Sequence, residues 1–198
     1  MSITLIVFLA LLALLVIWGV RIYNRLVALR NLIANAFGQI DVQLKRRHDL
    51  IPNLVEVARK YMEHEQATLT AVIQARNTAQ GAVQAARSQP ASGAAITALA
   101  VAEQTLMGQV GRLLAVSENY PDLKADQTMR ELSEEITSSE NRVSFARQAY
   151  NDAVLDFNNA AQAFPDLIVA RLTGFTLSEP LQVTSSEAER AAPSVRFD

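Results

Sequence analysis

The sequence predicts an all-α fold, in which an N-terminal transmembrane helix continues into a long antiparallel helical bundle with an extended C-terminal tail. Three observations lead to this prediction. Residues 3–20 form an uncharged apolar run, and about 18 such residues span the hydrocarbon layer of a membrane. Apolar residues then recur at steps of three and four over several long stretches, which is the spacing of one helix face. Prolines and glycines separate these stretches, as expected where helices end.

The apolar run is expected to be a retained membrane anchor and not a cleaved signal peptide. A signal peptide needs a basic region before a shorter apolar run, and a cleavage pattern of small residues. Only Met1 and Ser2 precede this run, and Trp18, Gly19 and Val20 end it. The side chains that define the anchor include Leu5, Phe8, Leu12, Leu15 and Trp18.

The charges that follow the anchor predict its orientation. Arg21, Arg25 and Arg30 come directly after it, so the positive-inside rule places the soluble part in the cytoplasm. The chain has no cysteine, which fits a reducing compartment and excludes disulfides and thiolate metal sites. We expect an anchor over 1–20, a bundle over 21–175 and an extended or disordered tail over 176–198.

Helical spacing continues without a turn signal after the anchor, so the first helix is predicted to cover about 3–48. A ladder of amides, Asn31, Asn35, Gln39 and Gln43, follows at steps of four and therefore lies along one side of this helix. Two interpretations stay open. The ladder is either a solvated face, or a polar seam that sets the register of packed or self-associating helices.

A proline interrupts the charged stretch that follows. Pro52 has no amide hydrogen and disfavours helical geometry at Ile51, so we expect a kink or break at 48–51, with Asp49 capping a second helix over 52–87. The candidate assembly or structural motif around this point consists of polar residues and the proline: Asn31, Asn35, Gln39, Asp41, Gln43, Arg46, Arg47, Asp49, Pro52, Asn53 and Glu56.

The second half of the chain predicts three more helices. A third helix is expected over about 92–118, after a loop rich in small residues with Pro90 and Gly93. A fourth, with a candidate cap at Asp126, is expected over about 126–164, before Pro165. A short helix over 166–172 ends near Gly174.

The basic residues of the motif are expected to pair with acids of the later helices. Arg46 and Arg47 have Glu118, Asp122, Glu140 and Asp152 as candidate partners, among which the sequence does not choose. Lys45 to His48 is too small a basic cluster for nucleic-acid binding, and we expect none.

No catalytic or metal-binding pattern stands out. His48 and His64 are the only histidines, and neither has a second histidine four residues away, as helical zinc sites do. Glu56, Glu63 and Glu65 could in principle bind a metal near His64, but such carboxylates are far more often charged residues on a solvated helix face. The chain also lacks a G-x-S-x-G elbow and a glycine-rich phosphate loop. We expect a non-enzymatic protein without a cofactor.

Several strings resemble the LemA family of bacterial membrane-anchored proteins. They are YNRLVALRN from Tyr23, QIDVQLKRRHDLIPNLVE from Gln39, AR at Ala75, ENYPDLKAD from Glu118, LSEEITSSENRVSFARQAYNDAV from Leu132 and FPDLIVARLTGF from Phe164. The resemblance implies a single N-terminal membrane helix, a soluble helical bundle and no recognised enzymatic activity. It also implies a bacterial inner-membrane location, and links to zinc-dependent membrane proteases and, in one branch, to magnetosome biogenesis.

Three functional hypotheses follow. The first is a scaffold that self-assembles into a homo-oligomer on the lipid bilayer. The second is an adaptor or regulator of a membrane metalloprotease, with 176–198 as a docking segment. The third is membrane remodelling by many anchored stalks.

Overall fold

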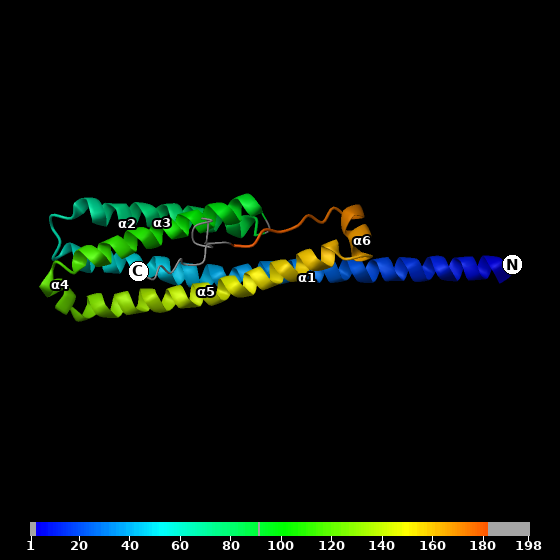
Figure 1. The fold of residues 1–198 in the computed structure, drawn as a ribbon, viewed down its shortest axis with the longest axis horizontal. Coiled ribbons are helices and arrows are strands. Elements are labelled where there is room, and N and C mark those ends of the chain that lie inside the picture. Colours follow the sequence, from blue (N-terminus) through cyan, green and yellow to red (C-terminus); the bar gives the residue numbers. More distant parts are fainter. Residues whose placement is uncertain (1–2, 91, 182–198) are drawn as a thin grey trace, which may run out of the picture.

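The computed structural model describes residues 3–90 and 92–181, and this part of the chain is all-helical, with no strand, as predicted. The helices are α1 (Ile3–Arg59), α2 (Gln66–Ser88), α3 (Gly93–Ser117), α4 (Pro121–Ala125), α5 (Gln127–Gln162) and α6 (Asp166–Leu172). Figure 1 shows α5 lying antiparallel along α1, and α2 and α3 forming a hairpin beside them.

The apolar start of α1 projects beyond every other helix of the bundle (Figure 1). It is long and apolar enough to cross a membrane, and none of its most apolar window is buried against the rest of the chain. The five side chains that define the predicted anchor are all exposed: Leu5, Phe8, Leu12, Leu15 and Trp18.

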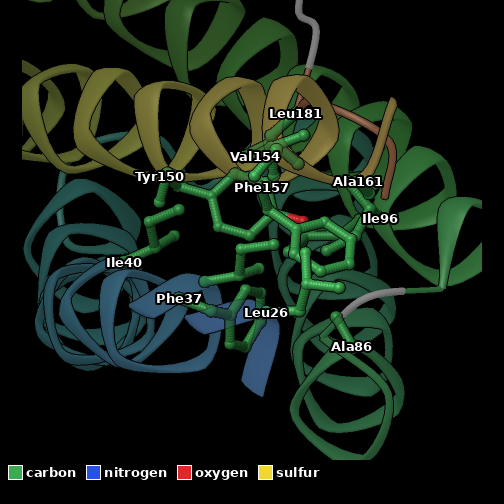
Figure 2. Packing of buried hydrophobic residues seen from close by; sticks show 14 of the residues in the cluster. Leu26, Phe37, Ile40, Ala86, Ile96, Tyr150, Val154, Phe157, Ala161 and Leu181 are labelled. Atoms are coloured by element: carbon green, nitrogen blue, oxygen red, sulfur yellow. The ribbon is translucent and has the colours of Figure 1, made fainter. Parts of the chain in front are cut away.

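The bundle has two apolar clusters, one on each side of a layer of buried charge. The cluster nearer the apolar start of α1 includes Leu26, Phe37 and Tyr150, and the rings of Phe37 and Tyr150 meet edge to face at 6.2 Å. Figure 2 shows this cluster assembled from α1, α2, α3 and α5. The far cluster includes Ile51 and Leu54.

The predicted break at 48–51 is wrong, because α1 continues through Pro52 to Arg59. A proline leaves the carbonyl four residues earlier without its helical donor. Here that carbonyl belongs to His48, and it accepts a hydrogen bond at 2.8 Å from Nε of Arg76 on α2. The turns on both sides are also held by packing, since Ile51 and Leu54 are fully buried.

The helix boundary next to the proline therefore moves. The first helix is not limited to 3–48, and the next begins at Gln66 instead of 52, after a turn over 60–65. Asp49 does not cap a helix but lies inside α1, where Lys45 binds it at 2.7 Å.

The remaining boundaries agree with the prediction within a few residues. Asp126 does cap α5, since its carboxylate accepts a hydrogen bond from the backbone N–H of Met129 at 3.0 Å, and α6 covers the residues expected. The short helix α4, with Pro121 in its first turn, was not predicted. Residues 176–181 have no helix or strand, and the rest of the predicted tail, 182–198, lies outside the described residues.

Candidate assembly motif and its buried charge layer

Arg47 lies at the centre of the motif and is 1 % exposed. Its two terminal guanidinium nitrogens form ion pairs with Glu103 of α3 and Glu140 of α5. Nε2 of the neighbouring His48 lies 2.8 Å from the other oxygen of Glu103. To donate to that carboxylate, Nε2 must carry a proton. The layer therefore joins α1, α3 and α5 at one level of the bundle.

Burial and charge act against each other on Glu103. Burial alone would raise the pKa of its carboxyl group, but the hydrogen bond from His48 and the positive charge of Arg47 outweigh burial and hold the pKa below its ordinary value of 4.5. Glu103 therefore stays ionised in the folded chain at neutral pH, as a partner of Arg47.

Acidification is expected to remove this stabilisation. Because the pKa of Glu103 is lower in the folded chain than when unfolded, its contribution to the free energy of unfolding is present above pH 4.5 and is lost as the pH falls through the folded-state pKa. Thermal unfolding of the full chain in detergent, followed by circular dichroism, should show a Tm that decreases below this pH. A Glu103→Gln variant should have a lower Tm at neutral pH and a flatter acid dependence. An unchanged dependence would exclude Glu103 as its source.

The other charges of the motif lie nearer the surface. Arg46 pairs with Glu135 of α5, and both side chains are about half exposed. Nη2 of Arg87 on α2 binds both carboxylate oxygens of Asp41, at 2.8 and 2.9 Å. Exposed pairs of this kind contribute about 0–1 kcal/mol each, so they orient α2 and α5 on α1 more than they stabilise the bundle.

The predicted pairing of Arg47 with Glu140 is confirmed. Within the described residues, no ion pair joins Arg46 or Arg47 to the other expected acids, which are Glu118, Asp122 and Asp152. Glu103 was not among the expected partners, although it is the only charged residue between Arg87 and Arg112. A single acid within a helix whose only other charged residue is Arg112 is the signal that could have identified it.

The polar members of the motif divide into two groups. Asn31, Asn35 and Gln39 are exposed on α1, as are Asn53 and Glu56 beyond the charge layer. Gln43 is half-buried, and its Oε1 is buried without a hydrogen-bond partner. The structure thus brings the basic residues together with acids of α3 and α5, but leaves most of the amide ladder facing outward.

A cavity of about 120 Å³ lies beside the charge layer, between α1, α3 and α5. α3 packs mainly on α2, and α5 packs mainly on α1. The cavity lies between these two pairs of helices. Its lining is mainly apolar, with Arg47, Glu103, Glu140 and Arg147 as the charged members. Burial lowers the pKa of Arg147, the charge of Glu140 raises it and that of Arg47 lowers it further, with a net decrease.

The segment that follows α6 runs to this cavity in an extended conformation. Two asparagines of α5 bind its backbone. Asn158 exchanges hydrogen bonds with the backbone of Ser178, at 2.8 and 3.0 Å, and Asn151 with that of Leu181, at 3.4 and 2.8 Å. The seven-residue step from Asn151 to Asn158 along α5 rises about 10 Å. The three-residue step from Ser178 to Leu181 in extended backbone has about the same length, so both asparagines can bind the segment. Leu181 then lines the cavity.

Tyr150 of α5 also contacts the backbone of this segment. Its hydroxyl donates to the carbonyl of Pro90 at 2.9 Å and lies 3.3 Å from that of Glu179. Burial, and secondarily the charge of Glu179, raises the pKa of Tyr150 to about 12. The hydroxyl is therefore a hydrogen-bond donor at neutral pH, and links the α2–α3 turn to the C-terminal segment.

The described residues contain no group of three or more histidine, aspartate or glutamate side chains placed to hold a metal ion. The charged side chains of the layer instead pair with one another across α1, α3 and α5. Together with one helix whose apolar start is exposed and a bundle of antiparallel helices, these features define a class: helical-bundle proteins led by a single helix that could span a membrane.

The chain belongs to the LemA family, whose family model matches residues 36–197. It is 23 % identical over 171 residues to magnetosome protein MamQ of Magnetospirillum gryphiswaldense, covering 77 % of this chain and 62 % of that protein. It is 32 % identical over 73 residues to magnetosome protein MamQ 2 of Paramagnetospirillum magneticum, covering 37 % of this chain and 27 % of that protein. The chain thus spans less than two thirds of the length of these relatives.

Proposed function

We propose that this chain is a non-enzymatic, single-pass membrane protein that self-associates side by side into a scaffold, through the outer face of α1. Its location would be a bacterial inner membrane, with the bundle in the cytoplasm, as the basic residues after the apolar run favour. The observation that carries the proposal is the exposed amide ladder, because the fold pairs the charged residues of the motif within the chain, Glu56 excepted, and leaves these amides available.

The exposed face of α1 has the spacing of a helix-packing seam. Small and amide residues, followed by one valine, recur at steps of four and three, which is the repeat of packed parallel helices. All are exposed except the half-buried Gly38. They are Asn24, Ala28, Asn31, Asn35, Gly38 and Val42. This stripe includes two members of the predicted ladder and adds positions at which two helices can approach closely.

A membrane anchor would favour contact between copies along this stripe. Helices that cross a bilayer in the same direction are parallel and are held at the same depth. The same amide of two neighbouring copies would then lie at one level, as in a symmetric interface. The side-chain amides of Asn31 and Asn35 can each donate and accept hydrogen bonds, so each asparagine can pair with the same asparagine of a neighbouring copy.

The mass of the intact chain in mild detergent tests the proposal. We expect a regular homo-oligomer by native mass spectrometry and by electron microscopy of the same preparation. A monomer at all protein concentrations would overturn self-association and leave an anchored bundle that needs a different partner.

Gly38 offers a substitution that separates assembly from folding. A Cβ atom added there would meet nothing within 4 Å in its own chain, and replacing a helical glycine should stabilise the monomer by about 0.5–1 kcal/mol. Gly38→Leu is therefore expected to reduce the oligomer mass while the Tm of the bundle is kept or raised. Gly81→Leu on α2, where an added Cβ atom also meets nothing within 4 Å, is the matched control and should leave the mass unchanged. Equal masses for both variants would place the contact elsewhere.

Membrane remodelling is a second candidate, favoured by the similarity to proteins named as magnetosome proteins. It would require the same side-by-side assembly, with curvature as its result. A membrane protease as partner stays a prediction from the family resemblance.

A further inference from the structure

The short helix α6 buries one carboxylate and exposes two large apolar side chains. Asp166 and Ala170 are buried, whereas Ile168 and Leu172, four residues apart on another face, are 51 % and 82 % exposed. Phe164, just before the helix, is also 82 % exposed. In water this arrangement is unfavourable, because apolar area remains hydrated while a carboxylate is desolvated. Exposed apolar residues that gather in this way mark a contact surface.

The position of α6 along α1 indicates which surface it contacts. Nη1 of Arg25 binds the buried carboxylate of Asp166 at 3.2 Å, and the ring of Tyr23 lies 5.8 Å from that of Phe175. These contacts hold α6 level with the first turns of α1 after the apolar run. Figure 1 shows α6 at the end of the bundle from which that run projects.

The distance from the apolar run matches the headgroup layer of a bilayer. From Val20 to Arg25 a helix rises about 8 Å, while interfacial helices insert about 5–10 Å around the boundary between headgroups and acyl chains. The 18 residues of the run rise about 27 Å, close to the full thickness of the hydrocarbon core. A helix level with Arg25 would therefore lie within the interface.

Basic residues lie on α6 and on the turns of α1 on either side of Arg25. Arg21 and Arg30 are exposed on α1, Arg171 is exposed in the last turn of α6, and the side chain of Arg25 is still 66 % exposed despite its ion pair. The nearest acid described here, Asp166, is buried and paired. Cationic and apolar side chains side by side are the combination that binds anionic lipid surfaces.

We propose that α6, with Phe164 before it, is a second membrane contact: an interfacial helix that inserts Phe164, Ile168 and Leu172 into the headgroup region of the bilayer that α1 would span. This inference rests on the proposed anchoring by α1. The contact would hold the C-terminal end of α5 down on the membrane, so that the bundle is attached at two points and cannot rotate freely about its anchor.

The experiment uses the full chain reconstituted in vesicles of phosphatidylcholine and phosphatidylglycerol, with and without nitroxide-labelled lipid. The chain has no cysteine, so an environment-sensitive fluorophore can be attached at Leu172→Cys or, as a control, at Val101→Cys. Val101 is an apolar residue of α3 that is also exposed. Trp18 is the only tryptophan and reports the anchor independently.

We expect lipid nitroxide to quench the label at position 172 several-fold more strongly than the label at position 101, with Trp18 quenched in both variants. Quenching of Trp18 without quenching at position 172 would overturn the interfacial helix while anchoring stands. A Trp18 that is not quenched would instead overturn the anchoring itself.

A further variant separates insertion of the native side chains from insertion of the fluorophore. With the label at Ile168→Cys, the changes Phe164→Ser and Leu172→Ser should remove most of the quenching, because two of the three inserting side chains are then lost. Both side chains are exposed in the bundle, so the changes should not disturb its folding. Quenching that persists in this variant would show that the fluorophore alone inserts, and would contradict the proposal.

Discussion

Replacing Arg47 with methionine is expected to lower the free energy of unfolding of the bundle by about 3–5 kcal/mol, because removal of one partner leaves a buried carboxylate without its counter-charge. Glu103 would keep only His48 as a partner, in a site where its side chain is 13 % exposed. Glu140, which is more exposed, can turn towards water and contributes less to the loss. Chemical unfolding of the full chain in detergent, followed by circular dichroism, measures the effect.

Arg46→Met is the matched control for this change. It removes the same kind of side chain one residue earlier, from a pair in which both partners are about half exposed, and should cost less than about 1 kcal/mol. Similar losses for the two variants would contradict the assignment of Arg47 as the central ion of the layer. Replacing Arg47, Glu103 and Glu140 together with apolar residues should recover much of the stability, since buried ion pairs rarely outperform well-packed apolar side chains.

Replacing Arg76 with methionine is expected to cost about 1–3 kcal/mol, because the carbonyl of His48 would lose its donor where Pro52 supplies none. The hydrogen bond in question joins Nε of Arg76 to that carbonyl at 2.8 Å. Pro52→Ala should supply the missing backbone amide from within α1. The cost of Arg76→Met should then be smaller in the Pro52→Ala background than in the natural chain.

A double-mutant cycle of these two changes measures the coupling directly. We expect a coupling energy of about 1 kcal/mol or more, as for residues that share one hydrogen-bonding group. Thr78→Ala is a control from the same helix: its hydroxyl bonds only to the carbonyl of Gln74 within α2, so its effect should be independent of Pro52. Additive effects of the Arg76 and Pro52 changes would mean that packing alone carries α1 past the proline.

The features that follow local rules could be predicted from the sequence. Apolar periodicity predicts the helical class and most helix ranges, and a single aspartate in the right place predicts the cap of α5. The break at Pro52 was predicted by the same local rules and is wrong, because the group that compensates for the proline comes from Arg76, 24 residues further along the chain. Local rules hold no information about such a distant donor.

The ion pairs of the charge layer also could not be predicted from local rules. Charge alone suggested that the motif arginines pair with later acids, and one of the four expected acids was found. The choice between Glu103, Glu135 and Glu140 depends on how far α3 and α5 rotate and slide on α1, which periodicity does not specify. The asparagines at 151 and 158 were missed for a related reason, since they bind an extended backbone that carries no helical repeat.

The continuity of α1 also has a mechanical meaning. The helix runs for 57 residues, about 86 Å at the usual rise, from the apolar start to the far end of the bundle without a linker. No joint lies between the segment that could sit in lipid and the charge layer around Arg47. A tilt or twist imposed at one end would therefore be transmitted to the other. If the apolar start spans a bilayer, forces on the bundle would then depend on the thickness and curvature of that bilayer.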